Sequence, residues 1–458
     1  MPDLHAAKSQ QEKLAEFDKV LGTGASGAKN PTPYRRVAQK IDGEPTFILL
    51  PDGFEISQVI ESLGRPLGER YLLILSYFYA RGLLWKKVDK KRGNFFRAHN
   101  ELLRELGGEN YAKLLRQGVA WGHIKKTGYI PKLKASSYML DRGTLTLDTR
   151  QRYQLTTKAA IRVRRDFQNR QRETFASKHA VYRKIADSIG RLTFDSVAAL
   201  RYVASIADAT DRQHRANVVE QLLLGVMNWS TDKQGRNYTV MTSVPRDIRR
   251  FFSCGVEPLF VVDISSSQPL LHALLYPSES DESRRYKALV EGGTFWAHMN
   301  KATGSKHDLS DEEQKAELKE AVFREVFYAY RETAKGAKGT YAKAFKAEFP
   351  ILWGEINARK KATGYKASGK LAKEMQHIEA WAVFDAINAL RAKPYPLISI
   401  HDAIVTTQDG VADVTEALQR AFVTADLQPK LAAKRLTIKA SEHASIMALP
   451  HSQRGAVH

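Results

Sequence analysis

The chain has 458 residues and 43% hydrophobic content, which is enough for two to four domains with sizeable buried cores and excludes a disordered polypeptide. Its formal net charge of +21 argues against a small-molecule enzyme that works without a polyanion, because so much like charge repels itself unless it is neutralised. The charge favours a nucleic-acid partner over a basic but inert surface, since the basic residues are spread along most of the chain.

Cysteine content and hydrophobic runs constrain the compartment. The only cysteine, Cys254, excludes an intramolecular disulfide and a cysteine-rich zinc site, which fits a reducing environment. The first residues lack the continuous apolar core of a signal peptide, and no run of about eighteen apolar residues occurs. We therefore expect a cytoplasmic protein that does not insert into a membrane.

The amino-terminal part divides into an arm and a compact module. Residues 1–45 are polar and contain closely spaced glycines and prolines, which is typical of a flexible arm. Within 46–145, apolar residues recur at helical spacing over 70–84 and 100–118, and 123–140 has the pattern of a basic hairpin with Gly128 at its turn. Helices followed by such a hairpin are typical of a winged-helix-like nucleic-acid-binding module.

Both this module and the region after it permit two interpretations. The module also fits a small helical domain whose lysines, Lys125, Lys126, Lys132 and Lys134, only solvate its surface. In 146–230, the arginine-rich helical stretch 158–172 is either a solvated linker helix or, as we slightly favour, a helix that tracks phosphates. Further helical patterns at 195–207 and 214–227 make 146–230 a helical linker or thumb.

Two acidic residues accompany strand signals in the region 231–458. The apolar run 259–262 predicts a buried strand ending at Asp263, and 395–407 predicts a hairpin with His401 and Asp402 at its turn. Two carboxylates on adjacent strands would repel each other unless cations lay between them. Two Mg²⁺ ions, or Mn²⁺, are the expected cofactors, because Mg²⁺ takes oxygen ligands and shares its shell with substrate phosphates. A structural role is the alternative for either acid.

A helical stretch lies between the two acids, at 311–330. Lys315, Lys319, Phe323 and Phe327 recur there every four residues and so share one helical face. Two cations and two aromatic rings on one face suit a triphosphate and a base. The alternative is a pair of lysines that snorkel beside two phenylalanines of the core.

Taken in order, these segments resemble the polymerase region of family A DNA polymerases and of the related single-subunit phage-type RNA polymerases. The likeness covers roughly 230–430 and consists of Gly235-Arg236 with Arg249, the palm motif Asp263-Ile-Ser-Ser-Ser-Gln268, the fingers helix from Lys315 to Phe327, the stretch 345–365 with Phe-Pro and Gly-Tyr, and His401-Asp402-Ala403. The resemblance implies a helix-rich α+β fold: a right-hand palm and fingers over 231–458, a helical thumb, and a winged-helix-like domain before them.

The resemblance also implies roles for individual residues. Asp263 and Asp402 would bind the metal ions, and Lys319 would act with them by neutralising charge on the incoming triphosphate. The implied substrate-binding residues are Lys315 for the triphosphate, Phe323 and Gln268 for the incoming base or sugar, Phe327 for the templating pair, and Arg236 and His401 for the primer strand and its terminus.

Several positions depart from the family pattern. Gln268 replaces a glutamate and Phe327 replaces a tyrosine, a pair that helps the family to exclude a ribose 2′-hydroxyl. Ala403 replaces an accessory glutamate, and Glu379 stands about where a glutamine near the template is common. The sugar preference of the nucleotide is therefore left open by the sequence.

These inferences predict a template-directed nucleotidyltransferase that binds template, primer and nucleoside triphosphates. No convincing set of paired acids for a proofreading exonuclease occurs in the first 230 residues. DNA synthesis is the first choice, and RNA or primer synthesis at the same site is the second. The alternative from a different class is a non-catalytic DNA-binding protein of replication or regulation that keeps the palm as a scaffold.

Overall fold

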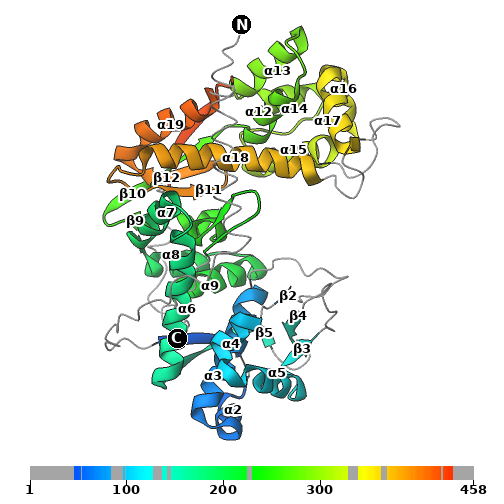
Figure 1. The fold of residues 1–458 in the computed structure, drawn as a ribbon. Helices are drawn as coiled ribbons and strands as arrows, with labels where there is room; N and C mark the ends of the chain where they lie inside the picture. Colours follow the sequence, from blue (N-terminus) through cyan, green and yellow to red (C-terminus); the bar gives the residue numbers. More distant parts are fainter. Residues whose placement is uncertain are drawn as a thin grey trace. The chain divides into compact units, whose positions relative to one another are not determined.

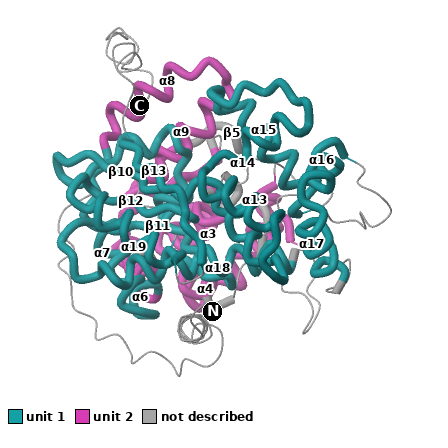
Figure 2. Tube along the Cα trace, turned by 90° about the horizontal axis from the view of Figure 1, so that it is seen from above, with its two compact units in different colours: residues 1–31, 175–194, 229–437 teal, residues 32–174, 195–228, 438–458 magenta. Residues whose placement is uncertain are grey.

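The computed structural model describes residues 46–52, 54–83, 96–97, 100–126, 137–141, 146–223, 229–328, 339–362, 369–423 and 426–436. The predicted arm 1–45, Gly128, Lys132, Lys134 and the Gly-Tyr at 364–365 lie outside these residues. The chain forms two compact units, each assembled from several segments (Figure 2). Unit 1 comprises 1–31, 175–194 and 229–437, and unit 2 comprises 32–174, 195–228 and 438–458, so the range 146–230 contributes to both.

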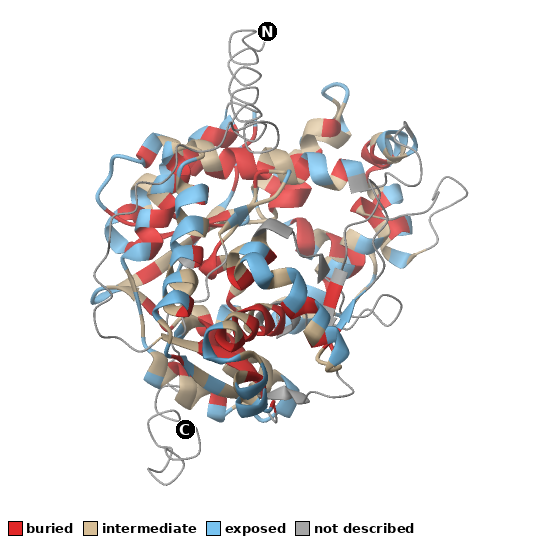
Figure 3. Cartoon of the chain, turned by 60° about the horizontal axis from the view of Figure 1, so that its bottom comes forward, coloured by how far each residue is buried: buried red, intermediate tan, exposed pale blue. Residues whose placement is uncertain are grey.

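Unit 2 is built around a long helix and an antiparallel strand pair. Its elements are β1 (Thr46–Asp52), α2 (Ile56–Leu63), α3 (Arg65–Leu83), β2 (Phe96–Arg97), α4 (Asn100–Gly107), the 3₁₀ turn η1 (Gly108–Asn110), α5 (Tyr111–Ala120), β3 (Ile124–Lys126), β4 (Ser137–Leu140), β5 (Thr146–Leu155), α6 (Lys158–Ala176), α8 (Ser196–Ala204) and α9 (Ala209–Leu223). On α3, every residue from Tyr71 to Leu75 is at most 2% exposed. The predicted helix at 70–84 is thus confirmed and forms the centre of the core of this unit, and Figure 3 colours the buried residues of the chain red.

Three short strands accompany the helices α4 and α5. They form an antiparallel sheet in the order β2–β4–β3, and the pairing of Ile124 with Leu140 confirms the hairpin predicted over 123–140. The single helix expected over 100–118 is wrong: α4 ends at Gly107, and α5 begins at Tyr111. Gly108 adopts a φ of +68° between them, a conformation that glycine reaches without a steric penalty, so the chain turns there.

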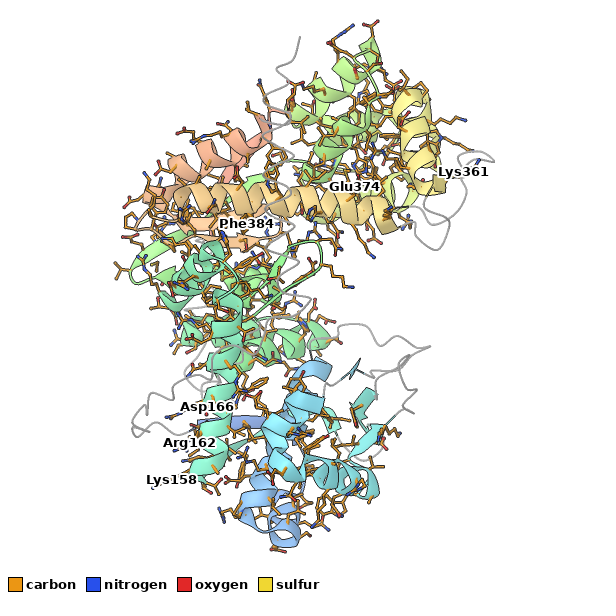
Figure 4. All side chains as sticks on the ribbon, viewed as in Figure 1. Lys158, Arg162, Asp166, Lys361, Glu374 and Phe384 are labelled. Carbon is orange, nitrogen blue, oxygen red and sulfur yellow. The ribbon has the colours of Figure 1, made fainter. Side chains whose placement is uncertain are left out.

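A buried carboxylate ties α3 to the start of α6. Glu69 is fully buried and accepts hydrogen bonds from the backbone N–H groups of Thr156 and Thr157 (both 2.8 Å) and from their hydroxyls (2.6 and 2.5 Å). These threonines directly precede α6, where the helix dipole favours a negative charge. The predicted arginine-rich helix is confirmed, and Lys158, Arg162 and Asp166 follow one another along α6 at one-turn intervals (Figure 4).

Unit 1 combines one sheet with a larger set of helices. Its elements are α7 (Ala180–Gly190), β6 (Leu192–Phe194), β7 (Ser230–Thr231), β8 (Asn237–Tyr238), α10 (Val240–Ser243), α11 (Arg246–Arg249), β9 (Phe252–Cys254), β10 (Glu257–Ile264), α12 (Ser267–His272), the 3₁₀ turn η2 (Ala273–Leu275), α13 (Asp281–Glu291), α14 (Phe295–Ala302), α15 (Glu312–Val322), the π-helical turn η3 (Phe323–Phe327), α16 (Thr340–Glu348), α17 (Pro350–Ala362), α18 (Gly369–Leu390), β11 (Ile398–Ile400), β12 (Ala403–Thr407), the 3₁₀ turn η6 (Gln408–Gly410), α19 (Val411–Val423) and β13 (Leu431–Arg435).

The strand β10 occupies the middle of a six-stranded antiparallel sheet. The strand order is β11–β12–β10–β9–β6, and β13 also pairs with β10. Residues 259–263 of β10 pair with β12, residues 260–264 pair with β13, and residues 257–258 pair with β9. Every residue of β12 is buried, as its apolar run predicts. The expected helix-rich α+β character is therefore confirmed for this unit.

Helices cover this sheet and extend away from it. Helix α19 packs on β10, β12 and β13, and α18 runs along α19 and also contacts α12 (Figure 1). Helix α15 begins at an N-cap, Asp311, whose carboxylate accepts from the N–H groups of Glu313 (2.8 Å) and Gln314 (3.0 Å). Among the described helices, none is long and apolar enough to cross a membrane.

Candidate active site

The two acids predicted as metal ligands lie at the same end of the unit 1 sheet, one on β10 and the other in the adjoining β11–β12 turn. Asp263 is the last but one residue of β10 and pairs with Ala403, the residue after Asp402. Asp402 lies in the two-residue turn between β11 and β12, where His401 has a φ of +54°. Such tight hairpins commonly require a positive φ. The predicted hairpin is confirmed, and it places Asp402 beside Asp263.

The electrostatics of Asp263 reflect this proximity. The pKa of Asp263 is raised to about 6, first because burial disfavours the charged form and second because Asp402 is close. Three cations oppose the rise: Lys319 from α15, Lys434 from β13 and Arg246 from α11. The end of the sheet therefore holds two mutually repelling carboxylates near three positively charged side chains.

Lys319 is the cation with the largest influence on Asp263. Its pKa is lowered, chiefly by burial and then by repulsion from Lys315 one turn earlier, while Asp263 favours its charged form. The Lys319 ammonium also lies 5.6 Å from the centroid of the Trp296 ring. Lys315 and Lys319 thus share the helical face expected from their spacing, and Lys319 on that face acts on Asp263.

A buried carboxylate on α18 connects the two acids to their surroundings. Glu379 is 1% exposed and accepts hydrogen bonds from Arg236, from the hydroxyl of Ser267 (3.0 Å) and from the side-chain amide of Gln268 (2.5 Å). Burial raises the pKa of Glu379, Asp402 adds to the rise, and Arg236 opposes it. The carboxylate is therefore stabilised by donors from the β7–β8 loop and from the start of α12.

Ser267 stands between Glu379 and the acid pair. Its hydroxyl oxygen lies 2.7 Å from Asp402 and 3.0 Å from Glu379. Because a serine hydroxyl carries one proton, it can donate to only one of these two carboxylates at a time. The hydroxyl of Ser267 consequently links the Asp402 carboxylate to the Glu379 carboxylate, because a donation to one leaves none for the other.

The end of the lysine-bearing helix departs from regular α geometry. The N–H of Tyr328 donates to the carbonyl of Phe323 at 2.7 Å, a five-residue step that belongs to a π-helical turn. Such a turn inserts one residue into the helical phase. As a result the Tyr328 hydroxyl donates to the side-chain oxygen of Gln268 at 2.6 Å, and the Tyr328 ring stacks on Phe323 with centroids 5.3 Å apart.

Phe327 does not reach the site. It is fully buried, with its ring 4.2 Å from that of His272 and 5.6 Å from that of Phe345. A ring enclosed in this way has no surface to offer a nucleotide. The π-helical turn explains the difference from the sequence expectation, because a strict four-residue step assigns Phe327 the place that Tyr328 takes.

Comparisons with known proteins give a distant match among solved structures. No family model matches the chain, and no curated protein matches it. Among solved structures, the chain is similar to the POL domain of Pol1 from M. smegmatis, determined in complex with DNA primer-template and dNTP. That match has a TM-score of 0.40 and 11% sequence identity, and it covers 60% of this chain and 73% of the other.

The structure brings most of the predicted residues into one region. Asp263, Asp402, Lys319 and Lys315 form the charged part, and Gln268 and Arg236 meet at Glu379. His401 sits in the hairpin turn with its ring 6.3 Å from that of Tyr238, and its pKa is lowered by partial burial and by Arg236. Phe323 packs edge-on against Trp296, with centroids 5.7 Å apart, and remains partly exposed.

Sequence reasoning missed several members of this region. Tyr328, Ser267, Lys434 and Arg246 were not singled out, and Glu379 was noted only as a departure. Lys434 and Arg246 lie in short elements whose basic residues look like those elsewhere in a chain of this charge. Tyr328 adjoins Phe327, so only knowledge of the π-helical turn would have identified it.

The donor set fits Mg²⁺ bound partly by substrate. The described residues contain no group of three or more histidine, cysteine, aspartate or glutamate side chains that could hold a metal by themselves. Mg²⁺ commonly uses one or two carboxylates and completes its shell with water and substrate phosphates. Asp263 and Asp402 supply such a pair, since burial and the nearby Asp402 together raise the pKa of Asp263 despite the surrounding cations.

Proposed function

We propose that this protein catalyses template-directed nucleotidyl transfer, with DNA synthesis as the favoured form. The observation that carries the proposal is the proximity of Asp263 at the end of β10 to Asp402 in the adjoining β11–β12 turn, with Lys319 acting on Asp263 from a separate helix. Two carboxylates that face a fixed cation can receive a metal-bound triphosphate. The protein's positive charge fits nucleic acid as the second partner.

Each residue has a defined task in this proposal. Asp263 and Asp402 would hold two Mg²⁺ ions, or Mn²⁺, which activate the primer 3′-hydroxyl and stabilise the leaving pyrophosphate. Lys319 and Lys315 neutralise charge that builds up on the triphosphate. The exposed part of the Phe323 ring offers a stacking surface for the base or sugar, while Arg236 and His401 approach the primer terminus.

The choice of sugar depends on the Tyr328–Gln268 pair. A tyrosine hydrogen-bonded to the residue at position 268 corresponds to the pair by which the resembled family excludes a ribose 2′-hydroxyl, with an amide in place of the carboxylate. The side-chain oxygen of Gln268 accepts a hydrogen bond from Tyr328, and its side-chain nitrogen donates one to Glu379. RNA or primer synthesis is the second candidate, because this amide departs from the family's glutamate.

The experiment measures incorporation on a primed DNA template with Mg²⁺ and either dNTPs or NTPs. Asp263→Asn and Asp402→Asn should each reduce incorporation by at least about a hundredfold, because each removes a charged metal ligand without a change of shape. Asp426→Asn is the matched control, since Asp426 is almost fully exposed and, among the described residues, forms its ion pair with Lys287 on the surface. DNA binding should persist in all three variants.

The outcomes separate the candidate functions. Incorporation of NTPs in preference to dNTPs would establish the second candidate. Absence of incorporation with either set at protein excess, together with retained DNA binding, would favour the non-catalytic DNA-binding alternative. Full activity of either active-site variant would show that the metal site is not at Asp263 and Asp402.

A further inference from the structure

Unit 2 contains a helix-turn-helix whose second helix has one face packed and one face open. Helix α4 and helix α5 are joined by the three-residue turn Gly108–Asn110. A Cβ atom at Gly107 would lie 2.7 Å from the Cβ of Tyr111 and 2.9 Å from the Cδ1 of Ile74. The glycine therefore permits the close approach of α4 to both α5 and α3.

The inner face of α5 is fixed against α3. Leu114, Leu115 and Gly118 are buried. A Cβ atom at Gly118 would lie 2.7 Å from the hydroxyl of Tyr71 and 2.6 Å from the Cδ1 of Ile124, so α5 is held tightly between α3 and the start of the hairpin. This packing sets which residues of α5 face outward.

The outer face of α5 combines cations with apolar groups. Ala112, Lys113, Arg116, Val119 and Ala120 are exposed, and Val119 is 43% exposed although it is a large hydrophobic residue. No described acid pairs with Lys113 or Arg116. Arginine and lysine bind the O6 and N7 acceptors of guanine, and small apolar side chains contact the thymine methyl group. These acceptors and the methyl group all lie in the major groove.

The β3–β4 hairpin is attached rigidly to the end of α5. Gly122 has a φ of +73° at the junction, and the N–H of His123 donates to the carbonyl of Gly118 at 2.9 Å. A hydrogen bond of 2.9 Å joins the Nδ1 of His123 to the hydroxyl of Tyr71. Lys125 and Lys126 are exposed on β3, and because Lys125 pairs with Asp141 at 2.7 Å, Lys126 is the residue of this strand that presents positive charge next to α5.

We propose that α5 inserts its outer face into the major groove of duplex DNA, with Lys113 and Arg116 directed at the bases and Lys126 of β3 at the adjacent backbone. This arrangement supports the winged-helix-like interpretation of the module over a merely solvated one. The proposed surface lies wholly within unit 2 and uses none of the residues of the candidate active site. The proposed DNA binding by α5 therefore does not depend on nucleotidyl transfer at the candidate active site.

The test uses the full chain and a short duplex DNA closed by hairpin loops at both ends, so that no primer terminus is present. Binding is measured by fluorescence anisotropy over a series of salt concentrations. The double variant Lys113→Ala/Arg116→Ala should bind roughly tenfold or more weakly, with a shallower salt dependence, because each lost contact removes affinity of that order. The matched control Arg391→Ala/Arg420→Ala removes two exposed charges from unit 1 and should bind like the wild type.

Two further measurements make the result specific. Val119→Glu places an acid on the same face without touching the packed side of α5, and it should weaken binding while the thermal unfolding transition stays unchanged. Duplex RNA of the same sequence should bind more weakly, because its major groove is too narrow for a helix. Equal binding of RNA, equal losses in both double variants, or no binding of the closed DNA duplex would each overturn the proposal.

Discussion

The hydroxyl of Tyr328 donates a 2.6 Å hydrogen bond to the side-chain oxygen of Gln268. This bond joins the end of the π-helical turn to the start of α12, two residues from the helix N-cap beside the acid pair. Burial raises the pKa of Tyr328, so the hydroxyl stays protonated and remains a donor at neutral pH. The bond fixes the amide of Gln268 in the orientation that also serves Glu379.

Tyr328→Phe should therefore relax the discrimination between dNTPs and NTPs. Loss of one buried hydrogen bond is worth about 0.5–1.5 kcal/mol, which corresponds to a change of roughly two- to tenfold in the ratio of kcat/KM values. Tyr341→Phe is the matched control, because its hydroxyl bonds to His307 away from the acids. An unchanged ratio in Tyr328→Phe would remove this pair from sugar selection.

Glu379→Gln should lower the stability of unit 1 well beyond an ordinary surface change. Arg236 would lose the carboxylate that compensates its own partial burial, and breaking a buried ion pair costs about 3–5 kcal/mol. Chemical denaturation measures the loss. Glu374→Gln on the same helix is the control, because Glu374 is about half exposed and its pair with Arg359 (Figure 4 labels Glu374) should contribute at most about 1 kcal/mol. Similar losses in the two variants would contradict the structural role of Glu379.

Glu69→Gln should destabilise unit 2 and flatten its response to acid. The pKa of Glu69 is lowered from 4.5, because hydrogen bonds from Thr156 and Thr157 outweigh the opposing effect of burial. A carboxylate with a lowered pKa contributes stability that is complete above pH 4.5 and is lost as the pH falls through its folded value. Unfolding of the wild type should thus become easier below pH 4.5, and the variant should lose about 2 kcal/mol or more at neutral pH.

The exposed Glu61 provides the comparison for that measurement. Glu61→Gln changes the same functional group on α2 and should leave both the stability and its pH dependence nearly unchanged. If Glu69→Gln unfolds with the wild-type pH profile, the threonine-bound carboxylate does not control the acid response.

Phe327→Ala and Phe323→Ala should have different consequences. Phe327 is fully enclosed, so its truncation should reduce the free energy of unfolding by about 3–5 kcal/mol. Phe323 is partly exposed and stacks on Tyr328, so its truncation should raise the KM for nucleotide with a smaller loss of stability. The opposite pattern would show that the helix continues in regular α phase past Phe323.

Local patterns predicted the strands and hairpin that carry the acids. The apolar runs at 259–262 and 395–407 are long enough to specify buried strands, and the acids follow from their places at the ends of those runs. The π-helical turn was not predictable, since no residue in Phe323–Phe327 marks it. The bonds of Glu379 were equally inaccessible, because Arg236 and Ser267 are more than a hundred residues distant in sequence. The break at Gly108 is predictable, because the adjacent glycines Gly107 and Gly108 are a turn signal.

The position of β10 between β12 and β13 has a consequence for co-translational folding. The partners on both sides of the strand that bears Asp263 are synthesised about 140 to 175 residues after it. The core of unit 2, by contrast, consists of residues from 48 to 167 and can close as soon as they leave the exit tunnel. A nascent chain would thus have its proposed DNA-binding helix in place long before its two acids could meet.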